Sequence, residues 1–175
     1  QKGSRITKVV IDAGHGGKDP GALGKRSREK DITLSVALKV GHYIEENLPE
    51  VQVIYTRTTD KFIELHERTA IANRNQADVF ISIHANANPS PRPYGSETYV
   101  MGLHKDDANL EVAKAENAVI LLEEDAEVQY EGFDPNSDVA YIIFNLYQGE
   151  NLEQSTLLAS EVQKQFKNRV GRKDR

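Results

Sequence analysis

The stretch "VVIDAGHGGKDPG", residues 9–21, decides the fold because it joins a buried strand to a glycine loop that carries one histidine. Its β-branched apolar residues predict a strand over 8–13. The glycines that follow let the backbone turn sharply and leave room for a ligand beside His15. A titratable ring on such a loop, directly after a buried strand, makes this turn a candidate functional site.

Strand and helix patterns alternate along the rest of the chain. In the segment 30–48 the apolar residues recur at the i, i+4 spacing of one helix face. The alternation predicts an α/β fold with a mostly parallel central sheet flanked by helices, in a single domain over residues 1–175. We expect further strands over 51–57, 78–86 and 95–102, and helices over 30–48, 64–76 and 151–168. The expected inner face of helix 30–48 is Ile32, Val36, Val40, Ile44 and Leu48, and that of helix 64–76 is Leu65, Thr69 and Ala72.

An acidic segment follows the expected fourth strand. Residues 106–131 hold nine acidic residues and one basic residue, and the middle of this segment has helical spacing. A further apolar run over 138–148 predicts a helix that Ser137 could cap. At roughly 40 residues, the insert 106–148 is much longer than the usual connection of about 2–6 residues in α/β proteins. We therefore expect an acidic helical insert after the fourth strand.

Composition narrows the classes of function. The 175 residues carry a net charge of −5, which argues against nucleic acid as the main partner. No apolar run approaches the roughly 18 residues of a membrane span. The first residues, "QKGSRITK", contain no apolar signal region, so we expect any export signal to lie outside this sequence. Because the chain has no cysteine, it forms no disulfide and offers no thiolate to a metal.

Two histidines occupy similar places in the predicted sheet. His15 and His84 each follow the end of a run that predicts a buried strand. Parallel sheets bind ligands at the carboxyl ends of their strands, and neighbouring strands lie about 4.8 Å apart, so the two imidazoles can converge. Taken singly, either histidine could be a loop residue that only makes hydrogen bonds. The glycine loop fits neither the dinucleotide-binding template nor the P-loop template for phosphate.

A metal bound by His15 and His84 would need a third ligand, and Glu29 is the natural candidate. Catalytic zinc sites commonly have three protein ligands and one open position, and two histidines with one glutamate are a known set. Glu29 precedes the expected helix 30–48, whose start should lie beside the strand ends. Alternatively, Glu29 only complements the dipole of that helix, and the spacing leaves both interpretations open.

Long ordered stretches of the chain carry a family resemblance over about residues 8–101. The first stretch and "SIHAN" together are highly specific. With these motifs, the sequence resembles the zinc-dependent N-acetylmuramoyl-L-alanine amidases, the cell-wall amidases of the AmiA/AmiB/AmiC type. The stretches are "VVIDAGHGGKDPGALG", "REKDITLSVALKV", "VIYTRTTDKFIELHERTAIANRNQADVFISIHANA" and "GSETYV".

The resemblance implies a site and a reaction. It makes His15, Glu29 and His84 zinc ligands, since they stand where the family has its glycine-loop histidine, its glutamate before the first helix and the histidine of "SIHAN". It implies hydrolysis of the amide between the lactyl group of N-acetylmuramic acid and L-alanine of the peptidoglycan stem peptide. The expected location is the cell envelope, periplasmic or secreted, with a role in cell-wall remodelling and daughter-cell separation.

The resemblance also implies a second glutamate near the C-terminus, which acts as general base in a segment like "VLVE-GF-SN". The given sequence reaches "VGRKDR" without such a segment, so no catalytic residue is assigned and little activity is expected of these 175 residues. We do not transfer the role to Glu131, although "VQYEGFD" contains Glu-Gly-Phe. Two alternatives follow, a peptidoglycan-binding module of the same fold and a zinc peptidase that acts on stem peptides.

Some members of the family block the zinc with a helix inserted at this point of the chain. By resemblance, the insert 106–148 would be a regulatory cap that a partner protein could lift, unless it is only a solvated acidic surface. Candidates for the inhibitory ligand in this cap are Glu116, Glu123, Glu124 and Glu127.

Two arginines are further candidates. We expect Arg57 to contact substrate carboxylates at the mouth of the site and Arg68 to pair with a buried acid, unless both side chains are only solvated.

Overall fold

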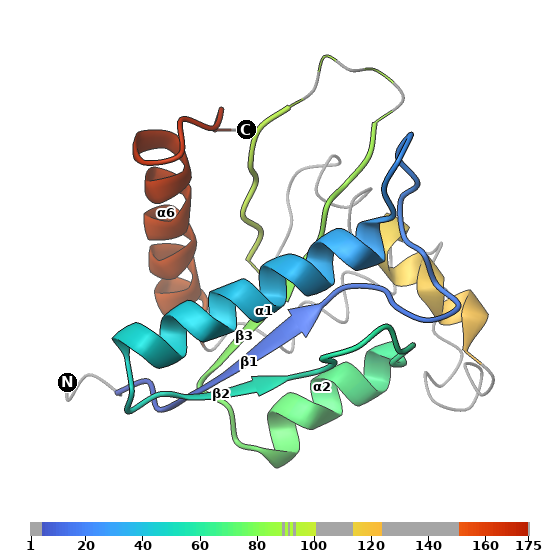
Figure 1. The fold of residues 1–175 in the computed structure, drawn as a ribbon. Coiled ribbons are helices and arrows are strands. Elements are labelled where there is room, and N and C mark those ends of the chain that lie inside the picture. The colour runs from blue at the N-terminus through green and yellow to red at the C-terminus, as the bar shows by residue number, and fades with distance from the viewer. Residues whose placement is uncertain are drawn as a thin grey trace. The chain divides into compact units, whose positions relative to one another are not determined.

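The computed structural model describes residues 5–88, 90, 92, 94–100, 114–123 and 151–174. The chain forms two compact units, Gln1–Ala87 and Asn88–Arg175. The sheet and both of its flanking helices belong to the first unit (Figure 1). The expected single domain over residues 1–175 stays a prediction.

The first unit is built around a three-stranded parallel sheet in the order β2-β1-β3. β1 (Lys8–Ala13) lies between β2 (Gln52–Tyr55) and β3 (Val79–Ile83) (Figure 1). A central parallel strand is covered on both faces, which explains why its sequence is almost continuously apolar. Val10 and Ile11 are completely buried. The predicted α/β class and the first three strands are confirmed.

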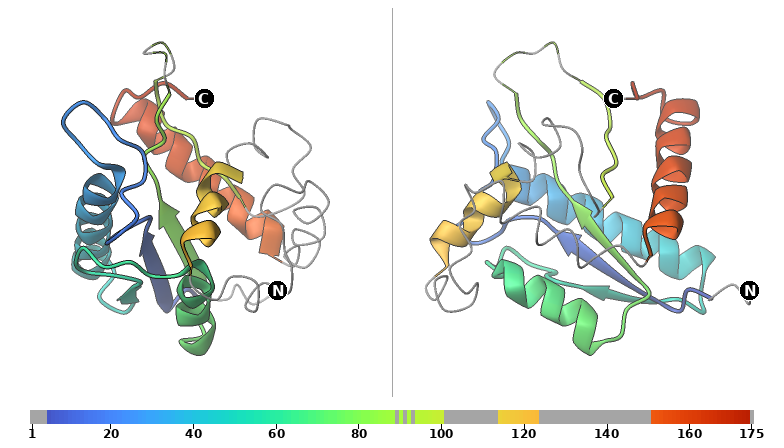
Figure 2. Two further views of the ribbon diagram at one scale, coloured as in Figure 1. Left: turned by 90° about the vertical axis from the view of Figure 1, so that its right-hand side faces the viewer. Right: turned by 180° about the vertical axis from the view of Figure 1, so that it is seen from behind.

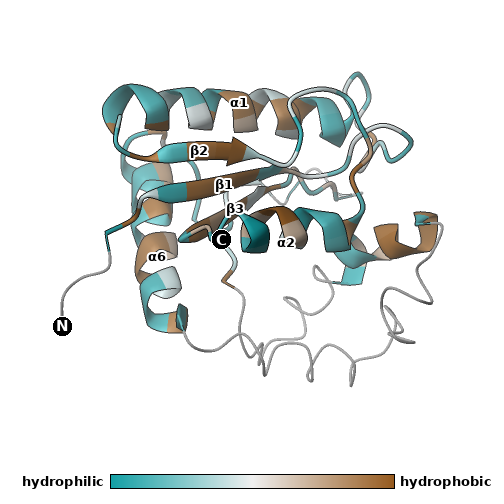
Figure 3. Cartoon of the chain, turned by 90° about the horizontal axis from the view of Figure 1, so that it is seen from below, coloured by the Kyte–Doolittle hydropathy of each residue, from teal (hydrophilic) through white to brown (hydrophobic). Residues whose placement is uncertain are grey.

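One helix covers each face of this sheet (Figures 2 and 3). α1 (Glu29–Asn47) packs against the face to which alternate residues of β1, such as Ile11, contribute apolar side chains. α2 (Leu65–Arg74) lies on the opposite face, where its Arg68 reaches Asp12 of β1. Successive side chains of a strand point to opposite faces. The buried strand therefore serves the apolar core on one side and a polar network on the other.

The inner face of α1 differs from the predicted stripe. Thr33, Ala37 and Gly41 are buried, whereas Ile32 and Val36 are 41% and 40% exposed. Small residues on the inner face let the helix lie close against the sheet, and this rotates the larger apolar side chains toward its flanks. The apolar spacing located the helix correctly and its buried face only in part, since Val40 and Ile44 of the predicted stripe pack against the core.

The inner face of α2 also differs in part from the prediction, although Leu65 and Ala72 are half-buried. Arg68 and Ile71 are its buried residues, whereas Thr69 is exposed. The inner face of α2 is partly polar because it meets the carboxylate of Asp12, which a search for apolar spacing cannot detect.

The predicted fourth strand is wrong for the residues that the structure describes. Residues 95–100 form no strand, and Ser96 makes only an isolated bridge to Asp174. The backbone groups of Ser96 are used inside the second unit. Its N–H donates to the carbonyl of Lys173 at 3.0 Å, and its carbonyl accepts from Gln163 at 2.6 Å. Gln163 belongs to α6 (Leu152–Asn168). This helix confirms the one predicted over 151–168.

The acidic insert is described only over 114–123. Residues 114–117 are helical and continue into a 3₁₀ helix, η1 (Ala118–Leu122). The helix predicted over 138–148 lies outside the described residues, as do Glu124, Glu127 and Glu131. The acidic helical insert as a whole is therefore not confirmed.

Candidate metal centre

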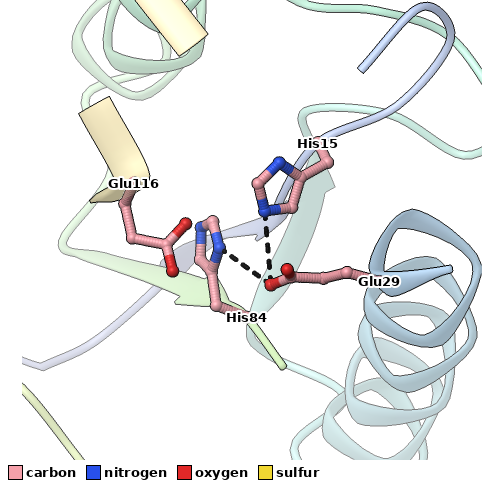
Figure 4. A group of neighbouring side chains, drawn as sticks. All are labelled: His15, Glu29, His84 and Glu116. Carbon is pink, nitrogen blue, oxygen red and sulfur yellow. Dashed lines mark ion pairs between the residues drawn. The ribbon is translucent and has the colours of Figure 1, made fainter. Parts of the chain in front are cut away.

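Three side chains meet at the edge of the sheet formed by the carboxyl-terminal ends of its strands, here called the carboxyl edge, all within the first unit (Figure 4). His15 lies in the loop after β1, His84 directly follows β3, and Glu29 is the first residue of α1. This is the edge at which parallel sheets bind ligands, because each strand ends there and its loop is free to vary.

The donor atoms of the three side chains have the spacing of metal ligands. Glu29 Oε1 lies 3.2 Å from His15 Nε2 and 3.3 Å from His84 Nδ1. Ligand bonds of about 2.0–2.1 Å in a tetrahedral zinc site place neighbouring donors about 3.3 Å apart. The two imidazole rings stand edge to face, with centroids 4.9 Å apart. Two nitrogens and one carboxylate oxygen in this arrangement fit a zinc ion.

A carboxylate behind His15 fixes the orientation of its ring. His15 Nδ1 donates to Asp19 Oδ2 at 2.7 Å, which leaves Nε2 as the nitrogen that faces Glu29. The other oxygen of Asp19 accepts from the backbone N–H of Gly21 at 3.0 Å. Burial raises the pKa of Asp19, but the hydrogen bonds from His15 and Gly21 outweigh it and the pKa falls below its ordinary value. Metal-binding histidines typically have such a carboxylate on their second nitrogen.

Asp19 was missed as a site residue in the sequence. The available signal was an acid four residues after the histidine in the same tight loop, a distance at which the two side chains can meet.

Two backbone groups hold the carboxylate of Glu29. Oε1 accepts from the N–H of Ala85 at 2.7 Å, and Oε2 accepts from the N–H of Ala22 at 2.9 Å. Burial raises the pKa of Glu29, but the contacts with both imidazoles and with these N–H groups outweigh it and hold the pKa far below its usual range. Glu29 also lies in the first turn of α1, where the helix dipole favours an anion. Its contacts with both histidines show that the dipole is not its only partner.

The loop backbone makes room for the rings. His15 has a φ of 61°, a left-handed conformation that costs a non-glycine residue roughly 1 kcal/mol or more. A Cβ on Gly14 would come within 2.5–2.9 Å of three atoms of the His84 ring. Gly21, with a φ of +63°, would place a Cβ 2.6 Å from the ring of His15. Glycine is required at both positions, since any side chain would displace one of the histidines.

Arg68 has the structural role that the sequence predicted. Its Nη1 lies 2.7 Å from Oδ1 of Asp12, and both side chains are 5% exposed. Thr56 and Ser82 donate to the two oxygens of the same carboxylate, each at 2.7 Å. Burial raises the pKa of Asp12, but Arg68 and these hydrogen bonds outweigh it and lower the pKa.

Arg57 lies in another position than the one predicted. It is 4% exposed, and its guanidinium donates to backbone carbonyls of the chain itself, including Ala13 and Gly14. A side chain committed in this way beneath the loop is not at the mouth of the site. We therefore withdraw its predicted contact with substrate carboxylates.

The remaining candidate ligands belong to the second unit or lie outside the described residues. Figure 4 also draws Glu116, which with Glu123 belongs to the second unit. The two units have no determined relative position, so the inhibitory role of both residues stays a prediction. His42 on α1 is exposed and pairs with Glu46 at 3.3 Å, away from the site. Among the helices that the structure describes, none combines the length and apolar character needed to cross a bilayer.

Comparison with known proteins identifies a family for nearly the whole chain. The profile of the N-acetylmuramoyl-L-alanine amidase family matches residues 9–175. The chain is 43% identical over 94 residues to N-acetylmuramoyl-L-alanine amidase AmiC of Escherichia coli O6:H1, a match that covers 53% of this chain and 22% of that protein. It is 32% identical over 170 residues to AmiA of Escherichia coli K12, covering 94% of this chain and 55% of that protein. The chain thus spans between about a fifth and about half of the length of these relatives.

Two solved structures of N-acetylmuramoyl-L-alanine amidases are similar to this chain in fold. The catalytic domain of CwlV, an N-acetylmuramoyl-L-alanine amidase from Bacillus (Paenibacillus) polymyxa var. colistinus, aligns with a TM-score of 0.52 at 40% identity, over 62% of this chain and 60% of that one. The amidase AmiC2 of Nostoc punctiforme aligns with a TM-score of 0.51 at 40% identity, over 70% of this chain and 66% of that one.

Proposed function

The chain belongs to the N-acetylmuramoyl-L-alanine amidase family, and from that premise we propose that it is part of a zinc hydrolase of peptidoglycan. The bond cleaved is the amide between the lactyl group of N-acetylmuramic acid and L-alanine of the stem peptide. The single observation that carries the proposal is the convergence of His15, Glu29 and His84 at the carboxyl edge of the sheet, with donor atoms 3.2 and 3.3 Å apart.

In this proposal the three side chains hold one zinc ion. Zinc at such a site polarises an amide carbonyl and makes a water molecule a stronger acid. Glu29 remains ionised and supplies negative charge to the site, and the N–H groups of Ala85 and Ala22 keep its carboxylate in place. Asp19 holds the ring of His15 so that Nε2 is the nitrogen that faces the metal. At 26%, the side chain of His84 is the most exposed of the three, so we expect substrate to approach from its side.

We propose the cell envelope as the site of action, periplasmic or secreted, because peptidoglycan is found there, and cell-wall remodelling and daughter-cell separation as the process. The acidic insert 106–148 is proposed as a cap over the site that an activator protein lifts. Its charge supports this, with nine acids against one base over 106–131, since carboxylates are good zinc ligands. If deletion of 106–131 from the full-length protein leaves its activity on purified peptidoglycan unchanged, the cap has no inhibitory role.

The zinc assignment is tested by replacing His84 with alanine and measuring bound zinc by plasma mass spectrometry. The expected result is loss of the metal with an unchanged circular dichroism spectrum. His42→Ala is the matched control, because it removes an imidazole from the exposed side of α1 and should retain one zinc per chain. Stoichiometric zinc in His84→Ala would show that the ligand set is wrong.

The reaction is tested by analysing the products that the full-length protein releases from purified peptidoglycan. An amidase releases intact stem peptides and leaves bare glycan strands. A zinc peptidase would instead release peptide fragments, and a binding module would release nothing.

A further inference from the structure

Arg57 is a buried cation that the proposed ligand set does not use. It stands two residues after the end of β2, and its guanidinium lies beneath the loop that carries His15. Its Nε donates to the carbonyl of Ala13 at 2.9 Å, and its Nη1 donates to that of Thr59 at 3.2 Å. Burying a charge is costly unless it is well hydrogen-bonded. So many backbone acceptors around one guanidinium point to a specific structural task.

That task is visible at the second terminal nitrogen. Nη2 of Arg57 lies 2.8 Å from the carbonyl of Gly14 and 2.9 Å from the carbonyl of Lys30. Gly14 immediately precedes His15, and Lys30 immediately follows Glu29. One nitrogen therefore joins the two backbone segments that carry the first two ligands.

Thr33 reinforces the same junction from α1. Its hydroxyl donates to the carbonyl of Gly14 at 2.8 Å and also contacts that of Lys30 at 3.2 Å. The same hydroxyl lies 3.2 Å from Nη2 of Arg57. Thr33 is completely buried, so water cannot replace these bonds if the hydroxyl is removed.

From this geometry we propose that Arg57 is a positioning residue for the metal centre. It sets the separation between the segments that carry His15 and Glu29, and Thr33 supports it. The inference rests on the proposed function, because it takes these two residues as ligands of one zinc ion.

Lysine cannot take the place of arginine in this role. The guanidinium is a planar fork with five donors, and here it contacts carbonyls of four different residues (Ala13, Gly14, Lys30 and Thr59). A lysine ammonium keeps the charge but is a compact group with three donors. Arg57→Lys therefore separates the effect of positive charge from the effect of the fork.

The experiment measures zinc affinity by competition with a chromophoric chelator. Arg57→Lys should weaken zinc binding by about 10- to 100-fold, as is typical when a support of a metal ligand is lost. Thr33→Val, which keeps the side-chain shape, should weaken it by about fivefold, the value of one buried hydrogen bond. Thr33→Ser restores a hydroxyl and should retain wild-type affinity. The visible spectrum of the cobalt-loaded protein should lose intensity in Arg57→Lys, because a tetrahedral site gives the strongest bands.

A core variant controls for general destabilisation. Val51→Ala removes buried apolar volume just before β2, at the opposite edge of the sheet from the site, and should lower the unfolding temperature without changing zinc affinity. Wild-type affinity and an unaltered cobalt spectrum in Arg57→Lys would overturn the inference while leaving the ligand set intact. Failure of the wild-type chain to bind zinc would instead overturn the proposed function. An equal loss of affinity in Val51→Ala would reduce the role of Arg57 to general stability.

Discussion

Replacing Asp12 with alanine should lower the free energy of unfolding by about 3 kcal/mol, the lower end of the range for breaking a buried ion pair. Asp12 is 4% exposed, and its carboxylate accepts bonds of 2.7 Å from Thr56, Ser82 and Arg68. Alanine leaves the guanidinium of Arg68, a residue that is itself only 4% exposed, without its anion. We take the lower end because Arg68 also donates to the carbonyls of three other residues, and these bonds persist.

The assay is urea and thermal unfolding followed by circular dichroism. For a chain of this size, a loss of about 3 kcal/mol corresponds to a fall of roughly 6–12 °C in unfolding temperature. Asp31→Ala is the matched control, because Asp31 pairs with Arg28 at a similar 2.8 Å but both side chains are about half exposed. Surface ion pairs contribute little, so the control should leave the midpoint almost unchanged. Equal effects of the two substitutions would refute the reasoning, since the pair of Asp12 is buried and has two further hydroxyl donors, whereas the pair of Asp31 is exposed.

Three further outcomes are expected. The pKa of Asp12 in the folded protein lies below its ordinary value of 3.8, so the ionised carboxylate stabilises the fold above about pH 4 and this stabilisation is lost as pH falls through the folded pKa. The difference in unfolding free energy between wild type and Asp12→Ala, measured by urea titration, should therefore shrink below about pH 4. Asp19→Asn should weaken zinc binding by about 10- to 100-fold in a chelator competition, because the ring of His15 loses its carboxylate partner, while Asp78→Asn at the opposite edge of the sheet should not. Gly14→Ala should abolish zinc binding and keep the sheet, because the added Cβ would lie 2.5 Å from the imidazole of His84. Zinc binding at wild-type strength in a calorimetric titration would contradict this.

The parts of the fold that depend on local pattern could be predicted from the sequence. β1 was predicted at its observed bounds, and α1 was predicted within one residue at each end. The meeting of His15 and His84 followed from the rule that parallel strands bind ligands at their carboxyl ends. The spacing left the role of Glu29 open, and its place as the third ligand came from the family resemblance. The structure brings these three side chains together.

The features that depend on long-range pairing could not be predicted. Three of the four carbonyls that Arg57 contacts lie 27, 43 and 44 residues away in the sequence, and only that of Thr59 is local, so the pattern around "YTRTTD" does not show that the side chain turns inward. The segment 95–100 has a strand-like pattern, but its backbone bonds go to α6 and to the residues beyond it. The inner face of α1 was predicted only in part, because close packing on the sheet selects small residues, and apolar spacing does not detect them.

The central claim is that His15, Glu29 and His84 bind one zinc ion together. The most direct measurement is an anomalous difference map from zinc-loaded crystals, collected on both sides of the zinc absorption edge. The account predicts one peak at about 2.0–2.2 Å from His15 Nε2, Glu29 Oε1 and a ring nitrogen of His84. A zinc peak elsewhere in the chain, with Glu29 still hydrogen-bonded directly to both imidazoles, would contradict it.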